Sequence, residues 1–294
     1  MYKHIAANKR NTILIIAGFI AFIGFIGCVF AYAYNNIYLA IWVFLLASLY
    51  AVIQYFLASS LAMAMTGAKE IEKKDCPRLY NIVENLSITT GLPMPKVCLI
   101  DDPAPNAFAT GRDPKTAVVA ATTGLLEIMN DKELTAVMAH EMSHVKNYDI
   151  RVSMIVFGLV CVVGFISDLG FRMLITSNRR SSSNDDRSPI GLIIVMLTSI
   201  LAPLAAALAQ MAVSREREYL ADMSAAHITR YPEGMISALK KLDTHSRPMR
   251  AQNSATEAMY INSPLKKGTV ASLFSTHPPI EKRIARLEDA KTKF

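Results

Sequence analysis

The residues best suited to chemistry form the segment His140-Glu141-Met142-Ser143-His144, which matches the pattern H-E-x-x-H. Positions four apart lie on one face of a helix, so the imidazoles of His140 and His144 can converge on one Zn²⁺ ion. Glu141 then reaches a water molecule on the metal instead of the metal itself. The pattern therefore predicts one catalytic zinc ion, with Glu141 as the general base.

A second polar segment is the candidate source of another ligand. A catalytic zinc of this type needs a third protein ligand and an open position. In Ser214–Asp222 (SREREYLAD), Glu218 and Asp222 are again four residues apart. The alternative is that this charged run is a solvated helix face, which is the usual role of such runs.

The H-E-x-x-H segment lies in a predicted helix. Asn130 followed three positions later by Glu133 is a capping-box signature, and the periodic segment Leu134–Tyr148 continues from it. An intramembrane protease would place this motif inside an apolar run. Here the motif is bracketed by charged residues, namely Asp131, Lys132, Glu133, Lys146 and Asp149.

Elements of an ordinary soluble layer precede this helix. Apolar residues recur at helical spacing in Pro77–Leu92, which predicts a helix. Lys96–Asp101 and Thr116–Thr123 are typical of strands, while Asp102–Pro114 contains Pro, Asn and Gly and is predicted as a loop. A small β-sheet is therefore expected.

The composition indicates a membrane protein, because 52% of the residues are hydrophobic and only 19% are charged. No charged residue occurs from Asn11 to Ala68, which is long enough for two transmembrane helices. We place these helices at about Ile13–Tyr34 and Ile37–Ala58, with Asn35-Asn36 as the turn. The net charge of +7 is the mild excess expected beside anionic lipid, so nucleic acid is not a predicted partner.

Two further apolar runs, Val152–Ile175 and Pro189–Val213, are separated by the polar linker Ser177–Ser188. Their lengths favour membrane spans over buried core helices, which gives four spans in total. His144 lies shortly before the third span and Glu218 shortly after the fourth. Helices that emerge on the same side of the bilayer would therefore bring these two ligands to a similar height.

The charges near the spans predict an orientation. Basic residues precede the first span, whereas the turn at Asn35-Asn36 has no charge, so the positive-inside rule places the N-terminus in the cytoplasm. An even number of spans returns the large polar segments to the same side. The linker between the third and fourth spans runs against this rule, since it contains Arg179, Arg180 and Arg187 beside Asp185 and Asp186.

The ordered motifs together resemble one protease family. HEMSH is followed, after two hydrophobic segments, by EYLAD and then by Ser275-Thr-His-Pro-Pro-Ile-Glu-Lys-Arg283, and is preceded by Pro105-Asn-Ala-Phe-Ala-Thr-Gly111. This series is similar to that of the HtpX-type bacterial membrane zinc metalloproteases, which are relatives of the CAAX prenyl endopeptidase. The resemblance covers nearly the whole chain, including the N-terminal hairpin.

The resemblance implies a role for each motif residue. Zinc is held by His140, His144 and Glu218, and Asp222 accepts a hydrogen bond that orients a ligand histidine. His277, which by sequence alone is a loop histidine, and Arg283 become candidates for stabilising the oxyanion and for supporting Glu218 or Asp222. Residues of the edge strand that holds the substrate backbone correspond to Asn106 and Ala107.

The implied fold is an α-helical integral membrane protein of about four transmembrane helices with a cytoplasmic α+β zincin-like (gluzincin) domain. Residues 1–68 form the first transmembrane hairpin and residues 152–213 the second. Residues 69–151 and 214–294 form the two parts of the protease domain, and the second part carries the third zinc ligand.

The implied function is zinc-dependent hydrolysis of peptide bonds in misfolded or damaged proteins of the bacterial inner membrane, with self-cleavage. The predicted partners are the lipid bilayer and unfolded membrane-protein substrates. One alternative is a narrow processing protease, which would cleave CAAX peptides but not unfolded proteins. Another is a non-proteolytic membrane adaptor with structural zinc, although structural zinc usually has four protein ligands and the sequence offers three.

Overall fold

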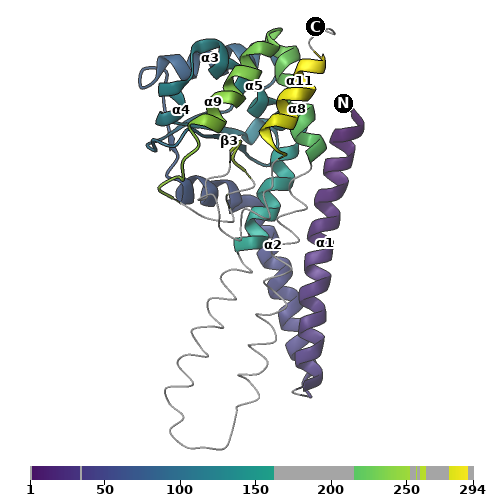
Figure 1. The fold of residues 1–294 in the computed structure, drawn as a ribbon. Helices are drawn as coiled ribbons and strands as arrows, with labels where there is room; N and C mark the ends of the chain where they lie inside the picture. The colour runs from purple at the N-terminus through teal and green to yellow at the C-terminus, as the bar shows by residue number, and fades with distance from the viewer. Residues whose placement is uncertain are drawn as a thin grey trace, which may run out of the picture.

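The computed structural model describes residues 2–33, 35–161, 215–251, 256, 259–262 and 278–290. A pair of long helices lies beside a mixed layer of shorter helices and a small sheet (Figure 1). The predicted third and fourth spans fall mostly outside the described residues, with helix observed at residues 149–161.

The long helices are α1 (Tyr2–Ala33) and α2 (Ile37–Thr66), which lie side by side (Figure 1). The chain turns between them at the predicted position, where Asn35 has a φ of 46° and the Asn36 side chain accepts a hydrogen bond from the Tyr38 N–H. Both helices are longer than the predicted spans, because α1 begins at Tyr2 and α2 continues to Thr66.

Length and hydropathy single out few of the described helices as able to cross a membrane. One is Ala6–Phe25 within α1. The pieces Ala40–Tyr50 and Val52–Thr66 of α2 also qualify if they form one span, with a bend of 44° between them.

The sheet has the strand order β1-β2-β4-β3. β2 (Lys96–Ile100) and β4 (Val118–Thr122) are parallel, with Lys96 opposite Val118, whereas β1 (Lys69–Glu70) and β3 (Ala107–Thr110) pair antiparallel to them. The predictions of strands near β2 and β4 are confirmed.

The loop expected from Asp102 to Pro114 contains strand β3, so that prediction was wrong. β3 has only four residues, and it lies between Asn106 and Gly111, whose types favour turns. Its extended form is stabilised by pairing with β4, from Ala107 opposite Ala121 to Thr110 opposite Val118. Such tertiary pairing is invisible in a short local pattern.

The remaining elements are α3 (Pro77–Thr90), the 3₁₀ turn η1 (Pro114–Thr116), α4 (Thr123–Ile128), α5 (Asp131–Lys146), α8 (Arg215–Thr229), α9 (Pro232–Thr244) and α11 (Ile280–Ala290). α3 and α5 confirm the two helices predicted from periodicity. The capping box at the start of α5 is also confirmed, because Asn130 and Glu133 each accept a hydrogen bond from the other's backbone N–H.

The sheet separates two apolar cores. Side chains alternate between its faces, so Val97 and Val119 pack with α3, α5 and α9. Cys98, Phe108 and Val118 belong to the other core, which includes Ile15, Phe19, Ala58 and Ala62 of the long helices and several residues of 152–159. The helices α3, α5 and α9 and the long apolar helices are thereby joined through one sheet.

The capping residue Glu133 also fixes α5 against α9. Its buried carboxylate accepts hydrogen bonds from Ser237 Oγ at 2.6 Å and Lys241 Nζ at 2.7 Å. Burial alone would raise the pKa of Glu133, but the bonds from Lys241, Ser237 and the Asn130 N–H lower it below its ordinary value. The ionised carboxylate therefore stabilises this packing.

We expect Lys241→Met to lower the free energy of unfolding by about 1 kcal/mol at neutral pH, because the lysine is partly exposed and solvent weakens the pair. The folded-state pKa of Glu133 is below the unfolded value, so its stabilisation is present above the ordinary glutamate pKa and is lost as pH falls through the lowered one. The difference from wild type should shrink over that acid range. Thermal unfolding in detergent measures the difference in stability between the wild type and the variant. Lys240→Met, at an exposed lysine, serves as the control. An equal loss in both variants would contradict the prediction.

Candidate metal centre

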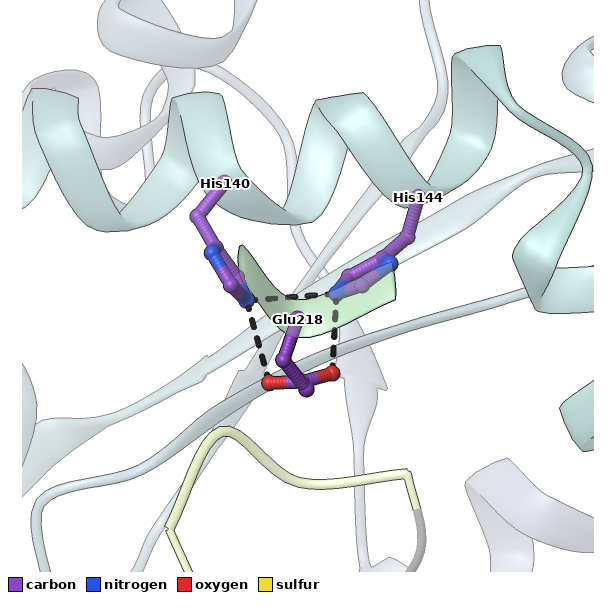
Figure 2. A group of neighbouring side chains, drawn as sticks. All are labelled: His140, His144 and Glu218. Atoms are coloured by element: carbon purple, nitrogen blue, oxygen red, sulfur yellow. Dashed lines mark hydrogen bonds and ion pairs between the residues drawn. The ribbon is translucent and has the colours of Figure 1, made fainter. Parts of the chain in front are cut away.

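Two helices bring three potential metal ligands together (Figure 2). His140 and His144 extend from the same face of α5, and Glu218 reaches them from α8. The two Nε2 atoms are 3.2 Å apart. Glu218 Oε2 lies 3.8 Å from His140 Nε2, and its Oε1 lies 3.5 Å from His144 Nε2.

This donor set fits a zinc ion. Tetrahedral coordination at the usual Zn–N and Zn–O distances separates neighbouring donor atoms by about 3.3–3.5 Å. With one ligand atom taken from each residue, the donor atoms all lie within 4.8 Å of one another, so they surround one possible metal position. Two imidazoles and one carboxylate also leave a fourth position open, as in catalytic zinc sites and unlike closed structural ones.

Asp222 orients the first of the two histidines. It lies one turn after Glu218 on α8, and its Oδ1 is 3.0 Å from His140 Nδ1, so the other ring nitrogen of His140 is directed toward the metal position. Arg283 of α11 makes a two-pronged contact with the same carboxylate, with Nε to Oδ2 at 2.8 Å and Nη2 to Oδ1 at 2.6 Å. Its Nη1 also lies 3.6 Å from Glu218 Oε2.

The charges in this buried group support one another. Burial would raise the pKa of Asp222 and lower that of Arg283, but their mutual attraction outweighs it and shifts both in the opposite directions. Burial is the main reason that the pKa of His140 is lowered, so this imidazole favours the neutral form that a metal requires. Of the two roles considered for Arg283, its contacts support that of holding Asp222 and Glu218.

Asp149 orients the second histidine, a role that was not predicted from the sequence. Its Oδ2 is 3.0 Å from His144 Nδ1. Burial alone would lower the pKa of His144, but the hydrogen bond to Asp149 and the nearby carboxylates raise it to about 9 in the absence of a metal. The available signal was a carboxylate five residues after His144, just beyond the end of α5 at Lys146.

Glu141 is buried beside the ligands and touches the edge of the sheet. Burial raises the pKa of Glu141 to about 7, with Glu218 adding to the rise. His144, Arg283 and a hydrogen bond from the Ala109 N–H act in the opposite direction. A carboxylate with a pKa near neutrality can accept and release a proton at physiological pH.

Ala107 begins β3 and Asn106 precedes it, at the outer edge of the sheet where the substrate strand is predicted to bind, but another segment of the chain already pairs with this edge. Met259–Asn262 lies along it, with Tyr260 bridged antiparallel to Phe108 and the Ile261 N–H donating to the Ala107 carbonyl at 3.0 Å. Asn106 adds two bonds through its side chain, because Nδ2 donates to the Asn262 carbonyl and Oδ1 accepts from the Asn262 N–H. The pairing of this segment with β3 was not predicted from the sequence.

His277, the other predicted site residue, lies outside the described residues.

Comparison with known proteins agrees with this arrangement. The sequence profile described as Peptidase family M48 matches residues 73–291. The chain belongs to peptidase family M48. As an M48 protein it is a metalloendopeptidase, which confirms the enzyme class predicted from the H-E-x-x-H pattern. The resemblance to HtpX-type proteases is confirmed as well.

Two curated M48 relatives illustrate the similarity. "Protease HtpX homolog" of Tropheryma whipplei (strain Twist) is 54% identical over 294 residues, which is 100% of both chains. The protein of the same name from Ligilactobacillus salivarius (strain UCC118) is 44% identical over 297 residues, covering 98% of this chain and 99% of the relative. Among solved structures, a crystal structure of S. mikatae Ste24p matches with a TM-score of 0.49 and 20% identity, covering 96% of this chain and 64% of that one.

The contact between Asp222 and His140 leads to a prediction about metal affinity. Asp222→Asn is expected to weaken zinc binding by about 10- to 100-fold, because it removes the charge that orients the ligand and neutralises Arg283. Competition with a chromophoric chelator measures the zinc affinity of the protein in detergent. Glu216→Gln is the matched control, since Glu216 is an exposed carboxylate on the same helix. Equal zinc affinity in the Asp222→Asn variant and the control would refute the role of Asp222.

Proposed function

We propose that this M48 protein is a zinc-dependent endopeptidase of the bacterial inner membrane that cleaves misfolded or damaged membrane proteins and also itself. The observation that carries the proposal is the group of His140, His144 and Glu218 beside the buried Glu141, at the edge of β3 that faces away from β4. A peptide-bond hydrolase needs these parts close together: a metal position, a proton acceptor and a rim of backbone that can align an extended chain.

The chain's own residues provide binding and proton transfer. His140, His144 and Glu218 would hold the zinc ion, which when bound acidifies water and polarises the scissile carbonyl. Glu141 takes the proton from the attacking water and delivers it to the leaving amine, and the Ala109 N–H holds its carboxylate in place. Arg283 contacts Glu218 and Asp149 contacts His144, and these contacts keep the ligands aligned. No covalent intermediate with the protein is needed.

The edge of β3 is the proposed binding site for the substrate backbone. Residues on alternate positions of a strand direct their backbone groups to the same edge, so the Ala107 carbonyl and the Ala109 N–H both lie on the edge away from β4. An extended peptide added there would run past Glu141 and the metal position. Met259–Asn262 occupies part of this edge, so a substrate strand has to displace it.

The apolar helices α1 and α2 support attachment to a membrane. We propose four spans, with the N-terminus and the active site in the cytoplasm. A membrane-impermeant thiol reagent tests this orientation in intact cells. It should label a cysteine introduced into the segment Ser177–Ser188 and leave Cys76 of the soluble layer unlabelled. The reverse labelling would overturn the orientation.

The role of Glu141 as general base gives a direct test of the activity. Glu141→Gln is expected to lower the turnover of an unfolded membrane-protein substrate, and of the enzyme itself, by about 10²- to 10⁴-fold. The shape of the side chain is kept and Glu141 is not a ligand, so zinc should still bind stoichiometrically. Purification under chelation, addition of zinc and electrophoresis of the cleavage products measure both reactions.

Three outcomes of that experiment are informative. Full cleavage by Glu141→Gln would overturn the mechanism. Cleavage of CAAX peptides without cleavage of unfolded proteins would favour the narrow processing protease. Bound zinc without any cleavage by the wild type would favour the adaptor.

Displacement of Met259–Asn262 predicts a gain of activity in one variant. Ile261→Pro removes the N–H that donates to the Ala107 carbonyl, so the edge should open more readily. A hydrogen bond contributes roughly 0.5–1.5 kcal/mol net, so the KM for an unfolded substrate should fall about 2- to 10-fold. Ile261→Val keeps the N–H and serves as the control. If KM is unchanged or higher in a stably folded Ile261→Pro variant, the substrate does not use this edge.

A further inference from the structure

The beginning of α1 reaches the metal centre. Asn8 is buried, although it lies in a helix that the sequence predicts as an anchor. Its Nδ2 donates to Asp149 Oδ1 at 2.7 Å and to the Asn147 carbonyl at 2.9 Å. In Figure 1 the N-terminal end of α1 lies at the level of α8 and α11.

The contact with Asp149 completes a path from α1 to a metal ligand. Asp149 Oδ2 is 3.0 Å from His144 Nδ1, so the two oxygens of one buried carboxylate are divided between the ligand and Asn8. Arg217 also lies near this carboxylate, with its Nη1 3.8 Å from Oδ1. Among the described contacts of Oδ1, the one from Asn8 is a hydrogen bond of 2.7 Å, so Asn8 is a direct donor that restrains rotation of this carboxylate.

The second hydrogen bond of Asn8 fixes the turn that carries Asp149. Asn147 caps the C-terminus of α5, and Tyr148 after it has a φ of 61°, which is an uncommon conformation for a non-glycine residue. A single Asn8 amide group bridges both sides of this turn. The donors of the amide are both satisfied, as expected for a buried polar side chain.

Packing of α1 holds Asn8 in place. Asn8, Thr12, Ile15 and Phe19 are buried and lie on one face of the helix. Ile15 and Phe19 belong to the same apolar core as Val152 and Ile155, which follow Asp149 directly in the next helix. The position of Asn8 is thus set by a packed helix and not by a loose terminus.

We propose that Asn8 is a positioning residue for the metal centre. It holds Asp149 so that this carboxylate orients the ring of His144 toward the metal, which makes α1 a part of the catalytic apparatus as well as an anchor. The inference rests on the proposed zinc site. It predicts that a change at the beginning of α1 alters metal binding although Asn8 touches neither the metal ligands nor the substrate edge.

Zinc affinity of the full-length protein in detergent tests the proposal. Asn8→Asp keeps the shape of the side chain but replaces the donor with a carboxylate beside Asp149, and Asn8→Ala removes the donor. Both variants are expected to bind zinc about 10- to 100-fold more weakly than wild type. The absorption spectrum of the Co²⁺-loaded protein should change as well, because it reports ligand geometry.

A matched control lies on the same face of α1. Thr12 is also buried, one turn after Asn8, and among the described residues its hydroxyl has no hydrogen-bond partner. Thr12→Val should therefore leave zinc affinity unchanged. Asn8→Gln retains the amide and should recover part of the lost affinity.

The kinetic expectation separates positioning from stability. The Asn8 variants should lower kcat at subsaturating zinc while leaving the KM of the peptide substrate unchanged. Wild-type zinc affinity and Co²⁺ spectra in Asn8→Asp and Asn8→Ala would overturn the proposal, even if both variants were less stable to heat. If the wild type binds zinc but cleaves nothing, the proposed function fails while the affinity comparison still decides the role of Asn8.

Discussion

The buried ion pair between Asp222 and Arg283 joins the parts of the molecule that must meet at the metal centre. Asp222 contacts His140 of α5, and Arg283 of α11 contacts both Asp222 and Glu218 of α8. A pair of charges removed from water is stabilising only when the geometry is good and the remaining donors are satisfied. Here the two-pronged contact meets that condition, and loss of either partner would leave an uncompensated charge in the core.

The metal ligands are restrained from two directions. Asp222 holds His140 from the side of α8 and α11, whereas Asp149 holds His144 from the turn after α5. The two carboxylates belong to different parts of the chain. The Arg283 guanidinium donates to Asp222, and the Asn8 amide donates to Asp149. Ligand geometry in this M48 protein therefore depends on the packing of α5 against α8 and on the contacts that α11 and α1 make with Asp222 and Asp149.

The edge of β3 that faces away from β4 is covered by another segment of the chain. Met259–Asn262 pairs with the backbone groups that an extended substrate would need, and Tyr260 packs edge-to-face on Phe108 with ring centroids 5.3 Å apart. The Ala109 N–H on the same edge holds the carboxylate of Glu141. Under the proposed function, occupation of the edge by Met259–Asn262 would favour substrates with an extended segment, because such a segment can compete for the same backbone groups.

The sequence by itself determined the chemistry and several elements around it. The H-E-x-x-H spacing, the capping box at Asn130 and the periodicity of α3 and α5 are local patterns, so they could be predicted from neighbouring residues. The third ligand was predicted from the spacing of Glu218 and Asp222 and from the family resemblance. Only the tertiary structure decided strand β3, which depends on pairing of short strands, and the contacts of Met259–Asn262 with β3 and of Asn8 with Asp149, which join residues more than a hundred positions apart. Asp149 lies only five residues after His144, but no motif marked it as the partner of that histidine. Asn8 in particular has no local pattern that marks it, and its role follows from where the packing of α1 places one amide group.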